Sequence, residues 1–187
     1  GVTREHRARV LVNAAGPWVT DVVRRVAGAN SSRNVRLVKG SHIIASRRFP
    51  GEHAYIFQQP DGRIVFAIPY ERDYTLIGTT DLLYEGDLDA VDIAPEEVTY
   101  LCEAASRYFA SPVTEDEIVS SYAGVRPLYE DNAASNSTVT RDYVFDLDQT
   151  GGAPLMNIFG GKITTFRELA ERGMHKLKDI FPQMGPD

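Results

Sequence analysis

A lysine stands at the start of an expected helix, directly after two glycines: Gly160, Gly161 and Lys162. The first N–H groups of a helix have no partner within the helix, and this end carries partial positive charge. The glycines would let a ligand come close to the backbone, and Lys162 would add a full charge. The pattern therefore suits an anion or a polarised oxygen atom. A tight strand-to-helix turn with a solvated lysine explains it equally well.

A phosphate-binding loop of the nucleotide-hydrolase type is excluded at this position. Met156 stands where that motif requires its first glycine, and Ile163 stands where it requires Ser or Thr.

Three further residues have side chains suited to chemistry. Arg126 lies in the strand-like stretch "SYAGVRPL". An unpaired guanidinium is costly to bury, so Arg126 forms either a structural ion pair or a planar fork that grips a carboxylate or phosphate. His42 in "KGSHI" is either a structural histidine or a near-neutral base. Asp81 in "IGTTD" is either a turn residue at a strand end or a carboxylate of the site.

Composition excludes several other classes of protein. The net charge of -6 and the pI of about 5.3 argue against a general nucleic-acid binder. We expect no metal site, because no Cys/His cluster has ligand spacing. Cys102 is the single cysteine, so an internal disulfide is impossible and a reducing compartment is expected. The longest apolar run, "IVFAIPY", is too short to span a bilayer, although attachment to a membrane surface stays open.

The two ends of the chain have the pattern of an α/β layer. Residues 8–14 predict a buried strand. Pro17 then opens a helix that Gly28 would end, with valines at 19, 22, 23 and 26 along one face. Residues 155–159 predict another buried strand. The final helix that follows has the apolar face Phe166, Leu169, Ala170, Leu177 and Ile180.

The middle of the chain predicts a mostly antiparallel sheet with one helix. Strands are expected at residues 35–45, 74–80, 118–128 and 138–147, and "PDG" joins "YIFQQ" to "RIVFAIPY" as a hairpin. Pro95 opens the helix, whose apolar face is Val98, Leu101, Cys102, Ala105 and Phe109.

In order along nearly the whole chain, these stretches resemble the FAD-dependent glycerol-3-phosphate dehydrogenases. The motif "NAAGPW" is shared with the wider amino-acid-oxidase-like flavoproteins. A more specific resemblance comes from the combination of "KGSH", "GTTD", "GVRPL" and "GGKITT".

The resemblance implies an α+β fold in two domains. Residues 1–30 and 151–187 would be C-terminal pieces of an FAD-binding, Rossmann-type α/β domain. Residues 31–150 would form an antiparallel-sheet cap domain that binds substrate.

The resemblance also implies a function. The family oxidises sn-glycerol 3-phosphate to dihydroxyacetone phosphate and passes electrons through FAD to a quinone. Such a protein is cytoplasmic, peripheral to the inner membrane, and a possible homo-oligomer. Alternatives are a related glycerol-phosphate or amino-acid oxidase, and a non-catalytic binding module of the same fold.

The resemblance assigns roles to the residues singled out above. Arg126 and Lys162 become substrate ligands beside the flavin, and His42 becomes the candidate base at the reacting face. We expect these three side chains to converge on one cleft. Around the isoalloxazine edge would lie Gly160, Gly161, Lys162, Thr164 and Thr165.

One departure from the family matters. No G-x-G-x-x-G occurs in the 187 residues, so the pyrophosphate site of a dinucleotide fold is missing. We therefore expect an internal piece of a longer flavoenzyme, which alone would hold no FAD and show no dehydrogenase activity. Two apolar faces would be left exposed and favour self-association; they comprise Val22, Val23 and Val26 on one helix, and Phe166 and Leu169 on the other.

Overall fold

The computed structural model describes residues 2–26, 33–130, 142–150 and 152–183. The chain divides into two compact units, which are described separately. The first unit comprises residues 1–36, 127–134 and 139–187, and the second comprises residues 37–126 and 135–138.

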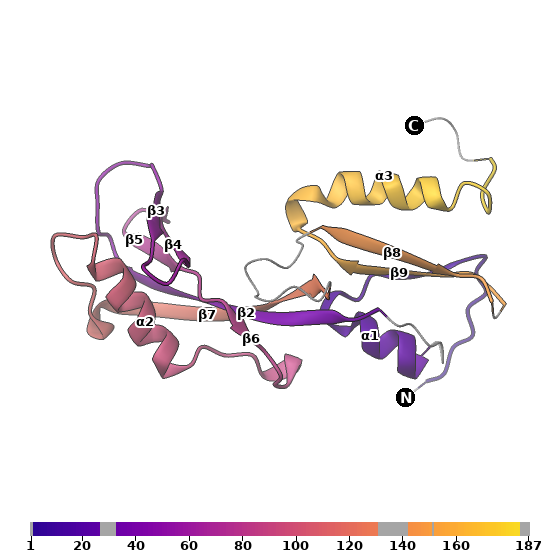
Figure 1. Ribbon diagram of the computed structural model, residues 1–187, viewed down its shortest axis with the longest axis horizontal. Coiled ribbons are helices and arrows are strands. Elements are labelled where there is room, and N and C mark those ends of the chain that lie inside the picture. The colour runs from indigo at the N-terminus through magenta and orange to yellow at the C-terminus, as the bar shows by residue number, and fades with distance from the viewer. Residues whose placement is uncertain (1, 27–32, 131–141, 151, 184–187) are drawn as a thin grey trace. The chain divides into compact units, whose positions relative to one another are not determined.

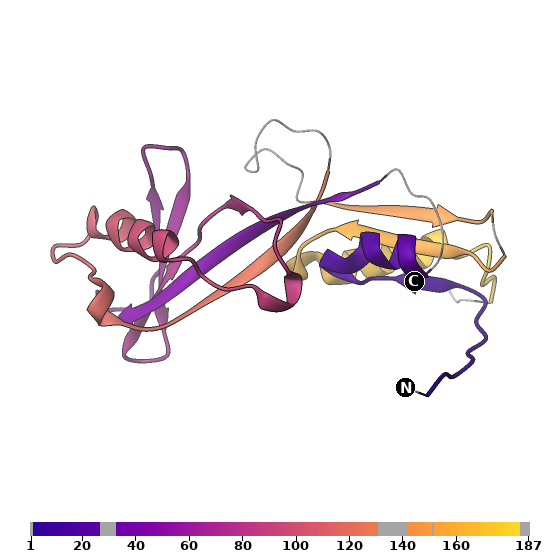
Figure 2. The same cartoon turned by 90° about the horizontal axis from the view of Figure 1, so that it is seen from below.

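The second unit is built on an antiparallel sheet. Five of its strands follow the order β3-β4-β5-β2-β6, and β7 pairs with β2, alongside which it runs in Figure 2. The strands are β2 (Val35–Ser46), β3 (Tyr55–Gln58), β4 (Ile64–Tyr70), β5 (Tyr74–Gly78), β6 (Leu82–Leu83) and β7 (Ile118–Tyr129). The expected hairpin is confirmed, since Tyr55 pairs with Ala67 and Gln58 with Ile64. This sheet confirms the predicted α+β fold class.

Helix α2 (Pro95–Ser106) covers one face of this sheet (Figure 1). Its predicted apolar face is confirmed, because Leu101, Cys102 and Ala105 are buried while Val98 and Phe109 pack at the margin of the core. The sheet contributes the side chains that alternate toward the helix, namely Ile43, Ala45, Phe57, Val65, Ala67 and Ile77. Each large aliphatic side chain buried in this way contributes about 1.5–3 kcal/mol.

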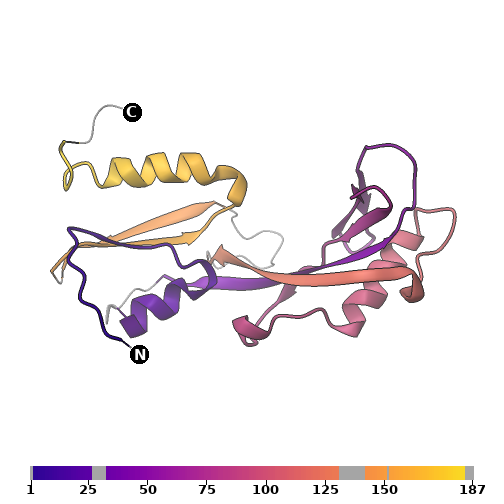
Figure 3. The same ribbon diagram turned by 180° about the vertical axis from the view of Figure 1, so that it is seen from behind.

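The first unit has helices on both faces of a three-stranded sheet in the order β1-β9-β8 (Figure 3). The strands are β1 (Leu11–Asn13), β8 (Tyr143–Asp148) and β9 (Leu155–Gly160). Strand β1 is parallel to β9, as in an α/β layer, whereas β8 is antiparallel to it. Helix α3 (Phe166–Lys176) lies on one face. The helical segment on the other comprises η1 (Gly16–Trp18), α1 (Val19–Asp21) and η2 (Val22–Val26).

The placement of β8 corrects an expectation. The strand expected at residues 138–147 was assigned to the antiparallel sheet of the middle segment, but β8 pairs with β9 instead. Residues 138–141 lie outside the described part of the chain, as does Gly28. The proposed division into an FAD-binding and a cap domain stays a prediction.

The burial of two apolar segments, β1 and the helical segment that contains Val23, also differs from expectation. Strand β1 is not buried as predicted, since Leu11 is 48% and Val12 45% exposed. The reason is that β1 has one neighbour, β9, in the described sheet. At the start of α3, Phe166 is 68% exposed as expected, whereas Val23 is buried against Phe159.

Helix α3 faces its sheet through a different residue from those predicted. At Gly173 an added Cβ would lie 3.4 Å from Phe145 and 3.6 Å from Met156, so the glycine allows close packing. Leu177, just beyond the helix, is buried as expected. Only part of the apolar face of this helix is therefore covered by the sheet, and Phe166 at its start is left exposed.

A buried carboxylate joins α2 to the sheet. Glu97 is 3% exposed and pairs with Lys39 at 2.6 Å. Its Oε1 accepts hydrogen bonds from the hydroxyls of Ser41 (2.8 Å) and Thr80 (2.6 Å), and its Oε2 accepts one from the backbone N–H of Ala94 (2.9 Å). We call Lys39, Ser41, Thr80 and Glu97 the Glu97 network. Burial opposes ionisation of Glu97, but the hydrogen bonds outweigh it, so its pKa is lowered.

Replacing Glu97 by glutamine is expected to lower the free energy of unfolding by about 3 kcal/mol, because Lys39 would stay buried without its counter-charge. The loss should depend on pH. The folded pKa of Glu97 lies below its unfolded value, so its stabilisation is present above about pH 4.3 and fades as pH falls further. Urea unfolding at pH 7 and pH 3.5 should therefore show a smaller difference between the two proteins at pH 3.5. Equal stabilities at pH 7 would contradict the role given to the network.

Candidate functional site

The face of the sheet in the second unit opposite α2 carries His42. Cross-strand pairing places His42 beside Gly78 and Ile44 beside Leu76, so these residues share one face. The same face carries partly exposed apolar side chains, which define what we call the open face: Ile56 (63%), Phe66 (37%), Ile68 (38%) and Tyr122 (47%). A contiguous apolar surface of this kind commonly serves binding.

The His42 imidazole is held between two neighbouring strands. On one side it occupies the space that a side chain at Gly78 would take, since an added Cβ would lie 2.1 Å from His42 Cδ2. On the other side Tyr122 stacks on it, with ring centroids 4.9 Å apart and planes 9° from parallel. Because both sides are occupied, the ring has little freedom to move.

Replacing Gly78 by alanine is therefore expected to lower the free energy of unfolding by about 1–3 kcal/mol, the usual cost of overpacking. Gly124→Ala is the matched control in β7, because no atom lies within 4 Å of its added Cβ; it should change stability by less than about 1 kcal/mol. Urea unfolding of both variants measures the difference. If G78A is as stable as G124A, the imidazole is not confined as described.

Arg126 lies near His42 on the same side of the sheet. Its Nη2 donates to the carbonyl oxygen of Thr80 at 3.2 Å and lies 3.6 Å from the Asp81 carboxylate. It also lies 3.1 Å from the position of an added Cβ at Gly40, so a side chain at residue 40 would crowd it. The guanidinium side chain is 36% exposed. Arg126 thus has the carboxylate partner that the structural alternative required, while part of its side chain remains accessible.

The electrostatics favour a neutral imidazole. Burial lowers the pKa of His42, and the positive charge of Arg126 lowers it further. His42 Nδ1 is buried, and it has no hydrogen-bond partner within the described residues. A neutral imidazole beside a cation can accept a proton from a bound hydroxyl while the cation holds an adjacent oxygen.

Lys162 belongs to the first unit, so its convergence with His42 and Arg126 stays a prediction. It is exposed and caps the turn η5 (Ile163–Thr165), which leads directly into α3. Thr164 is also exposed, and Ile163 is 87% exposed. This stretch therefore exposes a cation, a hydroxyl and an apolar side chain on the surface of the first unit.

The local backbone explains why residues 160 and 161, before Lys162, are glycines. Both have positive φ, +76° at Gly160 and +98° at Gly161, where glycine is favoured. An added Cβ at Gly160 would lie 2.9 Å from the carbonyl oxygen of Asp142, and one at Gly161 would lie 3.3 Å from Tyr143. The chain itself fills the space beside them, so the glycines alone do not indicate a ligand. The Thr165 hydroxyl donates to the Lys162 carbonyl at 3.0 Å, which tightens the turn.

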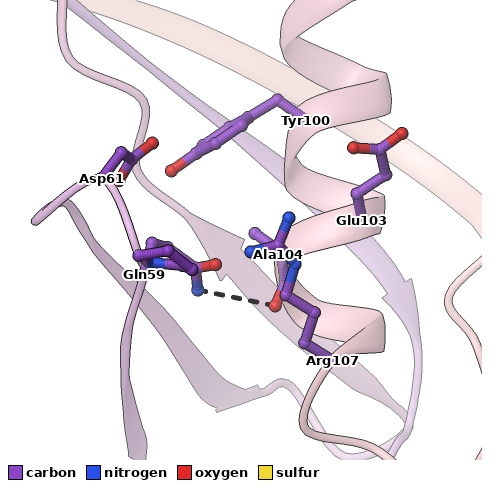
Figure 4. A pocket seen from close by; sticks show the side chains of 7 residues that line it. Gln59, Asp61, Tyr100, Glu103, Ala104 and Arg107 are labelled. Atoms are coloured by element: carbon purple, nitrogen blue, oxygen red, sulfur yellow. Dashed lines mark hydrogen bonds between the residues drawn. The ribbon is translucent and has the colours of Figure 1, made fainter.

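Two pockets of the second unit lie next to α2, and none of the three candidate side chains lines them. One, of about 150 Å³, is bounded by Gln59, Asp61, Tyr100, Glu103 and Arg107 (Figure 4). There the Gln59 amide donates to the Ala104 carbonyl at 3.5 Å, which ties the hairpin turn to the helix. The other, of about 170 Å³, touches the Glu97 network at Thr80 and Glu97.

Within the described ranges, no group of three or more His, Cys, Asp or Glu side chains could hold a metal ion. None of the helices described there is both long enough and apolar enough to cross a membrane.

Several parts of this arrangement were not predicted from the sequence. The contacts that matter are made between strands: Gly78 and Tyr122 enclose the His42 ring, and Gly40 leaves space for Arg126. A signal for the open face was present, because "IVFAIPY" is apolar at consecutive positions and so presents apolar side chains on both faces of a strand.

Comparison with known proteins gives consistent matches. The profile of the FAD dependent oxidoreductase family (DAO) matches residues 1–167. D-erythritol 1-phosphate dehydrogenase of Brucella abortus is 59% identical over 187 residues, which are 100% of this chain and 37% of that protein. Glycerol-3-phosphate dehydrogenase of Pseudomonas aeruginosa is 46% identical over 181 residues, 96% of this chain and 35% of that protein. The chain therefore spans about a third of the length of these relatives.

Solved structures agree with the fold. The glycerol-3-phosphate dehydrogenase of Bacillus halodurans complexed with FAD superposes with a TM-score of 0.76 at 34% identity, over 94% of this chain and 33% of that one. Glycine oxidase of Geobacillus kaustophilus has a TM-score of 0.60 at 20% identity, over 95% of this chain and 43% of that one; this match supports the fold alone.

Proposed function

This chain belongs to the FAD dependent oxidoreductase family, and we propose that it supplies the substrate-facing part of a flavoenzyme that oxidises a phosphorylated polyol. The observation that carries the proposal is the placement of His42 and Arg126 on one side of the sheet. Oxidation of an alcohol that bears a phosphate requires a base for the hydroxyl proton and a cation for the phosphate, and His42 and Arg126 are groups of these two kinds.

The residues at the start of α3 fit one end of FAD. Lys162 and the adjacent backbone N–H groups suit the carbonyl oxygens at the edge of a flavin ring, and the exposed Ile163 suits its apolar part. The proposed contacts are made by Gly160, Gly161, Lys162, Thr164 and Thr165. FAD, when bound, supplies the acceptor for the hydride. The pyrophosphate would be held outside these residues, because the sequence lacks the G-x-G-x-x-G motif.

The chain's own side chains would act on the substrate in three ways. His42 accepts the proton of the hydroxyl whose carbon is oxidised. Arg126 holds phosphate or hydroxyl oxygens through paired N–H donors. Lys162, which we propose also contacts the bound substrate or flavin, stabilises negative charge on the substrate oxygen or at the flavin edge. The apolar open face would exclude water from these polar groups.

D-erythritol 1-phosphate is the substrate that we propose first, and sn-glycerol 3-phosphate is the second candidate. The supporting observation is that identity to the relative named for D-erythritol 1-phosphate is 59%, against 46% for the glycerol-3-phosphate dehydrogenase. Both substrates present a phosphate and neighbouring hydroxyls, so His42 and Arg126 would serve either. A quinone acceptor, peripheral attachment to the inner membrane and homo-oligomerisation also belong to the proposal.

The test uses the full-length protein that contains this chain, purified with bound FAD. Anaerobic mixing with each polyol phosphate should bleach the flavin absorbance near 450 nm, and D-erythritol 1-phosphate should do so with the higher kcat/KM. Turnover with a quinone analogue but not with oxygen would support the dehydrogenase over the oxidase alternative. A flavin that neither substrate reduces would overturn the proposed function and favour a non-catalytic binding module.

A further inference from the structure

Thr80 connects the buried Glu97 network to the candidate substrate site. Its hydroxyl donates to Glu97 Oε1 at 2.6 Å and accepts from the backbone N–H of Ser41 at 2.8 Å. Its carbonyl oxygen accepts from Arg126 Nη2 at 3.2 Å. One residue therefore contacts the carboxylate on the helix side of the sheet and the guanidinium on the other side.

We propose that Glu97 and Thr80 are positioning residues for Arg126, an inference that rests on the proposed role of Arg126 in binding the substrate. Glu97 fixes the Thr80 hydroxyl, and the fixed Thr80 peptide presents its carbonyl oxygen to the guanidinium. Asp81, the next residue, then lies 3.6 Å from the same guanidinium.

The network is built rigidly enough to act in this way. The Glu97 carboxylate has four partners, which include the Lys39 ammonium and the backbone N–H of Ala94 at the start of α2. Lys39 is itself held by the carbonyl oxygen of Asp92 at 3.0 Å. Thr80 is 1% exposed, so water cannot substitute for its hydroxyl partners. A buried polar network of this kind, with its groups satisfied, rigidifies the elements that it joins.

The network also accounts for the composition of two sequence motifs. In "KGSH", the alternating Lys39 and Ser41 point to Glu97, whereas Gly40 and His42 lie on the open-face side. In "GTTD", Thr80 holds Glu97 and Asp81 approaches Arg126. The first motif thus contributes two groups to the network and His42 to the site, whereas the second contributes Thr80 to the network and Asp81 to the site.

The kinetic test uses Thr80→Val in the full-length holoenzyme, with Thr80→Ser as the matched rescue. Valine keeps the shape but removes the hydroxyl, whereas serine keeps the hydroxyl. Because a misplacement of about 1 Å can cost on the order of 10²-fold in rate, we expect T80V to lower kcat/KM at least about tenfold and T80S to stay within about threefold of wild type.

A double-mutant cycle separates positioning from general structural damage. If Thr80 acts through Arg126, adding T80V to an Arg126→Lys enzyme should lower kcat/KM by less than about twofold further. Effects that multiply fully would overturn the inference. Should T80V be recovered unfolded, Ser41→Ala removes a single hydrogen bond to the same carboxylate and is tested in the same cycle, with a smaller loss expected.

Crystal structures of the wild-type and T80V holoenzymes decide the question independently of turnover. We expect Arg126 to move by about 1 Å or more from the carbonyl oxygen of residue 80 in T80V, and to stay in place in T80S. An unmoved guanidinium would overturn the inference even if no polyol phosphate proves to be a substrate. An inactive wild-type enzyme would overturn the proposed function alone.

Discussion

Replacing Arg126 by alanine is expected to lower kcat/KM of the full-length enzyme for the proposed polyol phosphate by about 10³-fold. Each hydrogen bond from a charged donor contributes about 1.5–3 kcal/mol, and a planar fork makes two of them. Their loss removes about 4 kcal/mol, and each 1.4 kcal/mol corresponds to a factor of ten. Arg126→Lys keeps the charge but loses the fork, so it should cost at least about tenfold. Anaerobic flavin reduction by substrate measures both effects.

Arg72→Ala is the control for the arginine substitutions. Arg72 is exposed in the turn between β4 and β5. Since substitutions at exposed surface positions usually have small effects, R72A should leave kcat/KM within about twofold of wild type. If R126A has normal kinetics and normal FAD content, Arg126 serves only as a structural partner of Asp81.

The sequence predicted those elements whose pattern is local. The hairpin between β3 and β4 was found because Pro60-Asp61-Gly62 supplies turn geometry between two strand-forming runs. Helix α2 was found because its apolar residues recur at helical spacing after Pro95. Strands β2 and β7 were likewise predicted, at residues 35–45 and 118–128.

What the sequence could not show was which strands pair. Strand β8 was assigned to the wrong sheet because its own pattern is the same whichever sheet it joins. Similarly, Leu11 and Val12 form an apolar run typical of a buried strand, yet their burial depends on how many neighbours β1 has. These properties belong to the sheet and not to the segment.

The candidate site shows the same limit. His42, Arg126 and Asp81 were singled out by type, but their proximity depends on the pairing of β2 with β5 and β7. Glu97 was missed because an acidic residue in the first turn of a helix is usually solvated. The buried charge of Glu97 is compensated by its ion pair with Lys39, which lies 58 positions earlier in the chain. The joining of Lys162 to this site stays a prediction.

Replacing His42 by asparagine is expected to lower kcat of the full-length enzyme by about 10²–10⁴-fold, the usual contribution of a positioned general base. Asparagine keeps a polar group of similar reach but cannot accept the hydroxyl proton at neutral pH. His53→Asn is the control, because His53 is exposed on the loop before β3. It should leave kcat within about twofold of wild type.

The pH dependence distinguishes a base from a residue that only orients the substrate. A base must be neutral to act, and the pKa of His42 lies below its ordinary value of 6.5, first because of burial and then because of Arg126. In the wild type, kcat, which reports groups of the enzyme–substrate complex and not the phosphate of the free substrate, should therefore stay constant down to about pH 6.5 and fall only at lower pH. Arg126→Met removes the positive charge, so the pKa of His42 rises and the acid limb of the profile moves to higher pH. In H42N the acid limb should disappear. A limb that persists unchanged in H42N, or that R126M does not move, would assign the titrating base to another residue.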